Sequence, residues 1–114
     1  MSFKDKNKLD LIPDNLSDVC KFNFVNSISE CKSDRINFFL GCPDYLINLD
    51  PFDAYPDGTI LIISTSNDSA QVKHQSGSWF CGGDEVGTGY TEHIYKEGIK
   101  LVTKYAGMVY FYGS

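Results

Sequence analysis

The stretch TILIISTS, residues 59–66, decides the fold because it has the pattern of a strand in the middle of a sheet. Leu61 and Ile63 would lie on one face of such a strand. Ile60 and Ile62 would lie on the other, so both faces are apolar, which is typical of a sheet covered on both sides. The turn residues PDG immediately before it indicate where the strand begins.

Shorter strand-like runs follow toward the C-terminus, separated by turn residues such as Ser76-Gly77, Glu97-Gly98 and Ala106-Gly107. Because connections this short join antiparallel neighbours, we expect an antiparallel sheet that curls toward a sandwich or half-barrel. The predicted strands are AQVKHQ (70–75), SWFCG (78–82), TEHIYK (91–96), GIKLVTKY (98–105) and MVYFYG (108–113).

The run GIKLVTKY predicts which face of this sheet is solvated. Ile99, Leu101 and Tyr105 alternate along it with Lys100 and Lys104. We therefore expect the apolar set to face the core and the two lysines to face water.

Residues 16–31 fit two kinds of structure, because the run KFNFVN alternates like a strand while the apolar residues around it have helical spacing. We predict a helix over 16–31, packed on the sheet, and a strand at INFFLG, 36–41. The chain is then mainly β or α+β, with residues 1–114 forming a single domain. The residues with helical spacing are Leu16, Val19, Cys20, Phe24, Ile28 and Cys31.

The charge of the chain limits its partners. Ten basic and fifteen acidic side chains give a net charge of −5, which disfavours nucleic acid and anionic membranes as partners because both are bound mainly through Lys and Arg. The N-terminal residues are charged and lack the apolar run of a secretory signal, so we expect a cytoplasmic protein with no membrane segment. In that reducing compartment the cysteines are expected to be free thiols: Cys20, Cys31, Cys42 and Cys81.

No motif in the sequence predicts a catalytic site, a metal site or a cofactor. The glycine-rich run GGDEVGTG, 82–89, lacks the Lys-Ser/Thr ending of a P-loop and is interpreted as a flexible loop between strands. Cys81 with His74 or His93 could pair as a nucleophile and a base, but a cysteine beside two aromatic residues is more typical of a core.

The acid-rich stretch DPFDAYPDG, 50–58, is the strongest candidate for a functional surface. No basic residue lies between Arg35 and Lys73, so its acids have no partners nearby in sequence. One interpretation is a connecting loop whose aspartates cap turns and whose aromatics anchor it. The other is a surface that binds a basic protein through carboxylates and aromatic anchors. The predicted partner-binding residues are Asp44, Tyr45, Asp50, Phe52, Asp53, Tyr55, Asp57, Asp84 and Glu85.

The run FLGCPDYLINLDPFDAYPDGTILIIS, 39–64, together with the size and acidity of the chain, resembles the small immunity proteins of contact-dependent growth inhibition and related polymorphic toxin systems of bacteria. That resemblance implies a cytoplasmic protein that binds one cognate toxin domain, often a nuclease, and blocks its active site without catalysing a reaction. The resemblance transfers no residue roles, so the contact residues above come from charge and aromatic placement.

A second interpretation is a β domain that binds an apolar small molecule. The ligand would then lie among Trp79, Phe80, Tyr110 and Tyr112. The tyrosines of the C-terminal run could equally fill the core or form a contact face for a protein partner.

Overall fold

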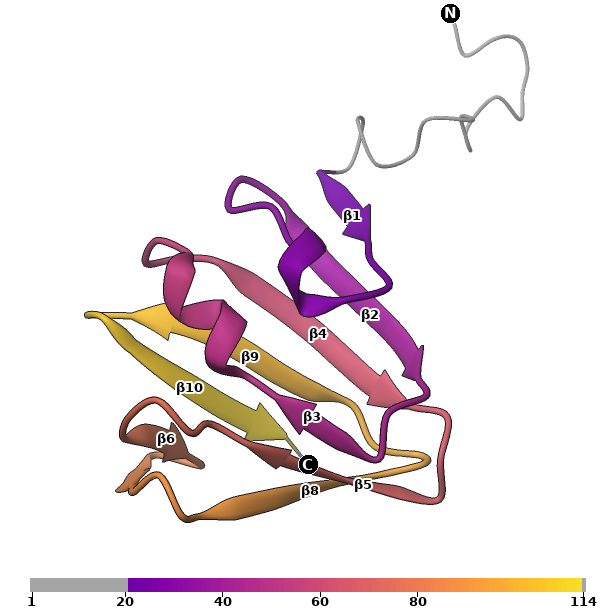
Figure 1. Ribbon diagram of the computed structural model, residues 1–114. Coiled ribbons are helices and arrows are strands. Elements are labelled where there is room, and N and C mark those ends of the chain that lie inside the picture. Colours follow the sequence, from indigo (N-terminus) through magenta and orange to yellow (C-terminus); the bar gives the residue numbers. More distant parts are fainter. Residues whose placement is uncertain (1–20, 114) are drawn as a thin grey trace, which may run out of the picture.

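Strands dominate the part of the chain that the structure describes, residues 21–113 of the computed structural model (Figure 1). Two short 3₁₀ turns, η2 (Ile28–Glu30) and η3 (Asp50–Ala54), interrupt them, and no helix of seven or more residues occurs in this range. The strands are β1 (Phe22–Phe24), β2 (Ile36–Cys42), β3 (Leu46–Asn48), β4 (Ile60–Thr65), β5 (Ser69–Lys73), β6 (Trp79–Cys81), β7 (Asp84–Val86), β8 (Thr91–Tyr95), β9 (Lys100–Tyr105) and β10 (Met108–Gly113).

The strands form two mixed sheets. Seven of them pair in the order β1-β2-β4-β9-β10-β6-β7, and β3-β5-β8 form a second, smaller sheet. The expectation of a mainly β fold is confirmed, but that of a purely antiparallel sheet is wrong. The pairs β1–β2, β2–β4, β3–β5 and β6–β10 are parallel, and the sheets do not close into a barrel.

The short connections explain why the antiparallel prediction failed. The β9–β10 connection at Ala106-Gly107 does join antiparallel neighbours, as expected. The connections at Ser76-Gly77 and Glu97-Gly98 instead carry the chain from one sheet to the other, since β5 and β8 belong to the small sheet and β6 and β9 to the large one. A short connection can join two packed layers as well as two neighbours in one layer.

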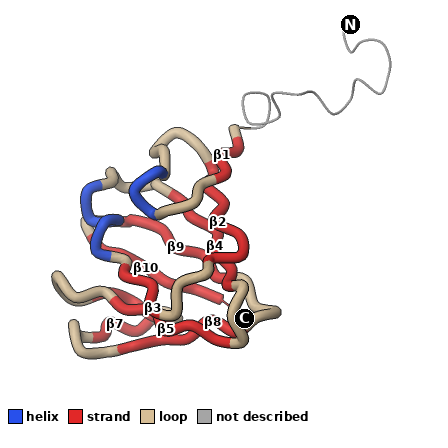
Figure 2. Tube along the Cα trace, turned by 45° about the vertical axis from the view of Figure 1, so that its right-hand side comes forward, coloured by secondary structure: helices blue, strands red, loops and turns tan. Residues whose placement is uncertain are grey.

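The core lies between the two sheets. The small sheet contributes Ile47, Val72 and Ile94, all 2% exposed or less, and the large sheet packs Leu61 and Phe111 against them. Figure 2 shows both 3₁₀ turns on the same side of the large sheet as the small sheet. No helix within residues 21–113 is long and apolar enough to cross a membrane.

Strand β4 lies inside the large sheet as predicted, but only one of its faces is covered. Leu61 and Ile63 are fully buried against the small sheet, whereas Ile60 and Ile62 are partly exposed on the opposite face. The expectation of cover on both faces is therefore wrong for the described residues.

Strand β9 is oriented opposite to the prediction. Val102 and Lys104 face the core, while Leu101 and Tyr105 are exposed. Lys104 tolerates this position because its Nζ donates hydrogen bonds to the carbonyl oxygens of Asp53, at 2.8 Å, and Tyr55, at 3.0 Å. A buried ammonium is stable when its hydrogens are paired in this way.

The helix predicted over 16–31 is wrong where the structure describes it, and residues 16–20 lie outside the described range. Residues 22–24 form β1 and residues 28–30 form η2. The fully buried Asn37 side chain holds this segment, since it accepts a hydrogen bond from the Asn23 side chain at 2.8 Å and donates one to the Ile60 carbonyl at 2.8 Å. These bonds connect β1, β2 and β4 and favour a strand over a helix. The strand predicted at 36–41 is confirmed as β2.

Candidate functional site

The stretch 50–58 begins with the turn η3, Asp50–Ala54, and its aromatic residues anchor it to the rest of the molecule. Pro51 stands at the start of the turn, where its missing N–H costs nothing. Phe52 is fully buried against the half-buried Tyr55, with ring centroids 5.4 Å apart. The Tyr55 hydroxyl donates to the Ile28 carbonyl at 2.9 Å. In this conformation the Phe52 ring belongs to the core and offers no surface to a partner.

A buried histidine, His74, directly follows β5 and contacts the acids of η3. His74 is 3% exposed; its Nδ1 lies 3.0 Å from the Gly77 carbonyl oxygen and its Nε2 lies 2.7 Å from Asp53 Oδ1. Both nitrogens face acceptors, so both hydrogen bonds form only when the ring carries two protons. The contact between His74 and Asp53 joins η3 to the segment that follows β5.

Asp50 fixes the turn that carries His74. Its Oδ1 accepts the backbone N–H groups of Gln75, at 2.8 Å, and Ser76, at 3.0 Å. Partial burial acts to raise the pKa of the Asp50 carboxyl, but these N–H groups outweigh it and hold that pKa below its ordinary value. The acids of the stretch thus have partners, supplied by residues more than twenty positions away.

The serine, histidine and aspartate of this cluster are not arranged as a catalytic triad. The Ser76 hydroxyl donates to Asp53 Oδ2 and lies 3.3 Å from Nε2 of His74, the same nitrogen that Asp53 contacts. In a triad the serine and the aspartate contact different ring nitrogens. Here the aspartate occupies the position from which the histidine would accept the serine proton.

The same cluster is the place in the described chain where a cation could be held. Asp50, Asp53 and His74 each offer a ligand atom, and these atoms lie within 4.8 Å of one another. The imidazolium form of His74 completes the hydrogen bonds of the cluster without any ion, so the geometry does not require one.

Next to this cluster lies a cleft of about 450 Å³. Asp53 and Glu85 line it, although they come from η3 and β7 respectively. Lys104 lies at its edge with the ammonium group already bonded to two carbonyl oxygens. The lining thus carries two carboxylates and two basic side chains, and the exposed Asp57 and Asp84 nearby make the surroundings of the cleft acidic. Its lining also includes His74, Ser76 and Met108.

The glycine-rich run 82–89 contributes a strand to this region instead of only a flexible loop. Gly82 and Gly83 take positive φ values of 61° and 101° in a tight turn, and β7 returns from it antiparallel to β6. This correction matters because the strand holds Asp84 and Glu85 at a fixed place, both exposed. Asp57 lies in the turn before β4, where it accepts the Gly107 N–H at 3.0 Å.

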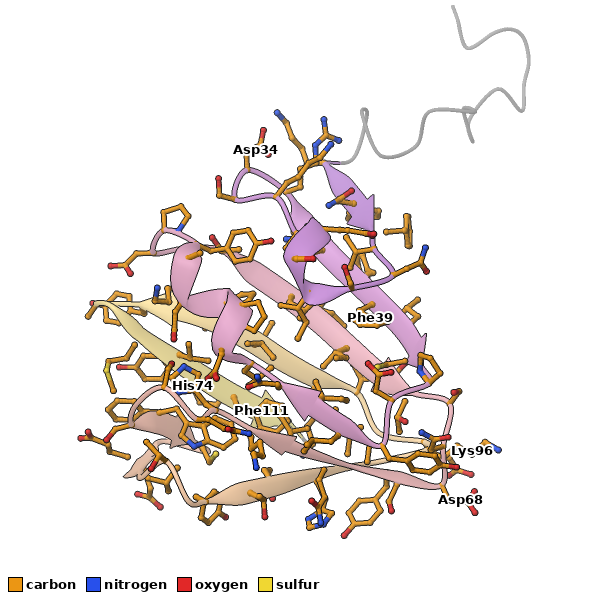
Figure 3. All side chains as sticks on the ribbon, viewed as in Figure 1. Asp34, Phe39, Asp68, His74, Lys96 and Phe111 are labelled. Atoms are coloured by element: carbon orange, nitrogen blue, oxygen red, sulfur yellow. The ribbon has the colours of Figure 1, made fainter. Side chains whose placement is uncertain are left out.

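Asp44 and Tyr45 lie apart from the other predicted site residues. They are exposed in the connection between β2 and β3, with Tyr45 75% exposed. Asn67 donates to the carbonyl oxygens of Pro43 and Asp44, which brings this connection beside Asp68, at the end of the molecule away from His74 (Figure 3). The predicted surface therefore divides into two separate parts.

The aromatic residues proposed for a small-molecule pocket do not line one cavity. Trp79 is fully buried in the core, whereas Phe80 stacks on Tyr110 on the opposite face of the large sheet, with ring centroids 4.4 Å apart. Neighbouring residues of a strand point to opposite faces, which excludes a shared pocket here.

The thiol considered as a nucleophile is held in its neutral form. Burial raises the pKa of the Cys81 thiol to about 11, and the charge of Glu92 adds to this effect. A thiol with such a pKa is a poor nucleophile at neutral pH. Cys31, Cys42 and Cys81 are all free; Cys20 lies outside the described residues.

Sequence reasoning identified the acids of the cleft but missed the residues that position them, His74, Ser76 and Lys104. The available signal was indirect. An acidic stretch with no nearby base must take its counter-charges from residues far away in sequence. Lys104 was a candidate for such a residue, because it lies in a predicted strand with few other polar positions.

Comparisons with protein-family models, with curated proteins and with solved structures found no match to this chain.

Proposed function

We propose that this protein is a non-catalytic inhibitor, an immunity protein that binds the basic surface of a cognate toxin domain and covers its active site. The toxin domain would be a nuclease, because an enzyme that binds nucleic acid needs a basic cleft. The protein would act in the cytoplasm, where the target of a nuclease toxin lies.

The observation that supports this proposal is the acidic cleft. Asp53 and Glu85 face the same hollow from separate elements, and Asp57 and Asp84 lie exposed on elements next to it. The contacts of His74 and Lys104 hold η3 in place, so the carboxylates are positioned before a partner arrives. A rigid acidic surface both steers a basic partner and avoids an ordering cost on binding.

Carboxylates of this cleft are suited to bind Lys or Arg side chains that would otherwise contact phosphates. We assign this contact to Asp53, Asp57, Asp84 and Glu85, with Asp50 supporting the turn behind them. Asp44 and Tyr45 could contact the same toxin only across the width of the molecule, so we assign them no role in the cleft.

The experiment begins with the product of the open reading frame next to this gene, expressed in a bacterial host with and without this chain. We expect the neighbour to arrest growth, and this chain to relieve the arrest and bind the neighbour directly. A neighbour that is harmless, or a toxin that this chain neither binds nor neutralises, contradicts the proposal.

A matched pair of charge variants locates the surface. Replacing Asp84 with Asn and Glu85 with Gln together should slow association at least about fivefold and flatten its salt dependence, because these acids act through long-range attraction. Asp34→Asn removes a charge in the loop before β2, at the top of the view in Figure 3 and away from His74, and should leave association nearly unchanged. Equal effects of the two changes would exclude the cleft as the binding surface.

A further inference from the structure

The face of the large sheet that points away from the small sheet is mostly apolar from β1 to β6. Backbone register aligns one row of side chains across five strands: Phe24, Phe38, Ile62, Leu101 and Tyr112. Every member of this row is partly or largely exposed; Phe24 is 57% and Leu101 is 37% exposed. We call this side of the sheet the outward face.

A second row crosses all seven strands beside the first. It starts at the β1 edge and ends at the β7 edge, and none of its members is buried. Glu85, at the β7 edge, is its only charged residue, and the first row carries no charge. The second row consists of Phe22, Ile36, Ile60, Thr103, Tyr110, Phe80 and Glu85.

We propose that two copies of this protein associate through their outward faces, sheet against sheet. Seven strands spaced about 4.8 Å apart, four of them about 20 Å long, give this face a projected area of about 500 Å². Two copies would then bury at least about 1,000 Å², which is the lower limit for a specific interface. An apolar patch of this extent is near the upper end of what a soluble monomer exposes, and patches of that size are often functional.

Charge favours a second copy over the basic partner proposed above. A basic protein needs carboxylates opposite its lysines and arginines, and the outward face offers one acid at its edge. In a two-fold arrangement each patch meets its own copy, so an apolar, nearly uncharged face is complementary to itself. The side of the acidic cleft formed by Asp53, His74 and Lys104 would remain open in both copies, whereas Glu85 would lie at the edge of the interface.

The rings of the outward face are already ordered by stacking on one another. Ring centroids lie 5.3 Å apart in the pair Phe24–Phe38 and 6.1 Å apart in the pair Tyr110–Tyr112, both stacked. Rings held in this way lose little freedom on association. Between β4, β9 and β10 a hollow of about 360 Å³, lined by Ile62, Leu101 and the side chain of Lys100, can receive a protruding ring of the second copy.

Sedimentation velocity of the full chain over a range of concentrations tests the proposal. We expect the wild-type chain to sediment at twice the monomer mass in the micromolar range. Leu101→Lys should raise the dissociation constant more than about a hundredfold, because the two-fold interface would bury one unpaired ammonium from each copy. The matched control is Tyr95→Lys on β8, which places the same charge at a 63% exposed aromatic position of the small sheet and should leave the dimer intact.

The unfolding midpoint of each variant, measured in dilute solution, separates a lost interface from a lost fold. If Leu101→Lys does not fold, Leu40→Lys, at a 54% exposed position near the end of β2, provides the same test. A wild-type chain that remains monomeric overturns the proposal and leaves residues 1–20 or another protein as the cover of this face. A dimer that survives the outward-face variants overturns it as well, since another surface must then hold the copies together.

Discussion

On the face of the large sheet that packs against β3, β5 and β8, Val102 and Phe111 are buried, whereas their neighbours in sequence, Leu101 and Tyr112, reach solvent on the other face. The two faces are similar in apolar content. The buried face even contains strongly polar side chains, Asn37 and Lys104 among them. What distinguishes the faces is their cover: the small sheet and η3 lie over one, and no residue from 21 to 113 buries the other.

This comparison shows that composition alone does not reveal which face of a strand becomes the core. A lysine can lie inside when backbone carbonyls pair its ammonium group, and a row of aromatic and aliphatic residues can lie outside, where we propose that a second copy covers it. The three predictions below test the difference between the faces, from the largest expected effect to the smallest.

The adjacent residues Phe111 and Tyr112 give the most direct test. Phe111→Ala should lower the free energy of unfolding by about 3–5 kcal/mol, because it opens a cavity between the two sheets. Tyr112→Ala should cost about 1 kcal/mol or less when measured on the monomer, since its ring is 38% exposed. Denaturant unfolding in dilute solution measures both values, and similar losses at the two positions would mean that the outward face is covered within one chain.

The sequence was sufficient to predict most of the strands but not their orientation, and it missed the three-residue strands β1, β3 and β7. In β4 the continuous apolar run predicts a strand, but Ile62 and Ile63 are chemically identical, so the run leaves the buried face undetermined. In β9 the alternation favoured the wrong face, because the contact that stabilises Lys104 comes from η3, about fifty residues earlier in the chain. Parallel pairing was missed for the same reason, since it depends on crossovers between layers that local patterns do not encode.

The candidate site was predictable in its acids and not in its geometry. Asp50 and Asp53 are conspicuous in the sequence, yet their partners His74 and Ser76 are brought to them only when the small sheet packs against the large one. The rings of Phe52 and Tyr55 were predicted as contacts or anchors, and the structure has the Phe52 ring in the core. Composition could not separate those two roles, because both require an aromatic residue beside a loop.

The second prediction concerns the lysine on the buried face. Lys104→Met should lower the free energy of unfolding by about 2–3 kcal/mol, because the carbonyl oxygens of Asp53 and Tyr55 lose a charged donor in a partly buried site. Lys96→Met, at an exposed position far from His74 (Figure 3), should change it by less than about 0.5 kcal/mol. If both variants are equally stable, Lys104 does not hold η3 to the sheet, and the distinction between a buried and a solvated lysine fails.

The third prediction has the smallest effect and appears only in acid. The pKa of Asp50 is lower in the folded chain than its ordinary value of 3.8, so this carboxylate stabilises the fold fully above that value. Its contribution disappears as the pH falls through the folded-state pKa. Asp50→Asn keeps an oxygen for the N–H groups of Gln75 and Ser76 but removes the charge. The difference in stability between wild type and this variant should therefore be constant from pH 5 to pH 7 and shrink below about pH 4.

Asp50→Ala is the control, because it removes both the charge and the acceptor oxygen. It should be less stable than Asp50→Asn at neutral pH, since the two N–H groups lose their partner, and its difference from wild type should shrink over the same acidic range. Unfolding midpoints measured at each pH give both comparisons. A difference that stays constant to the lowest pH would show that the N–H groups bind the Asp50 side chain without favouring its charged form. The anchoring of the His74 turn to η3, which covers the buried face, would then rest on the hydrogen bonds alone.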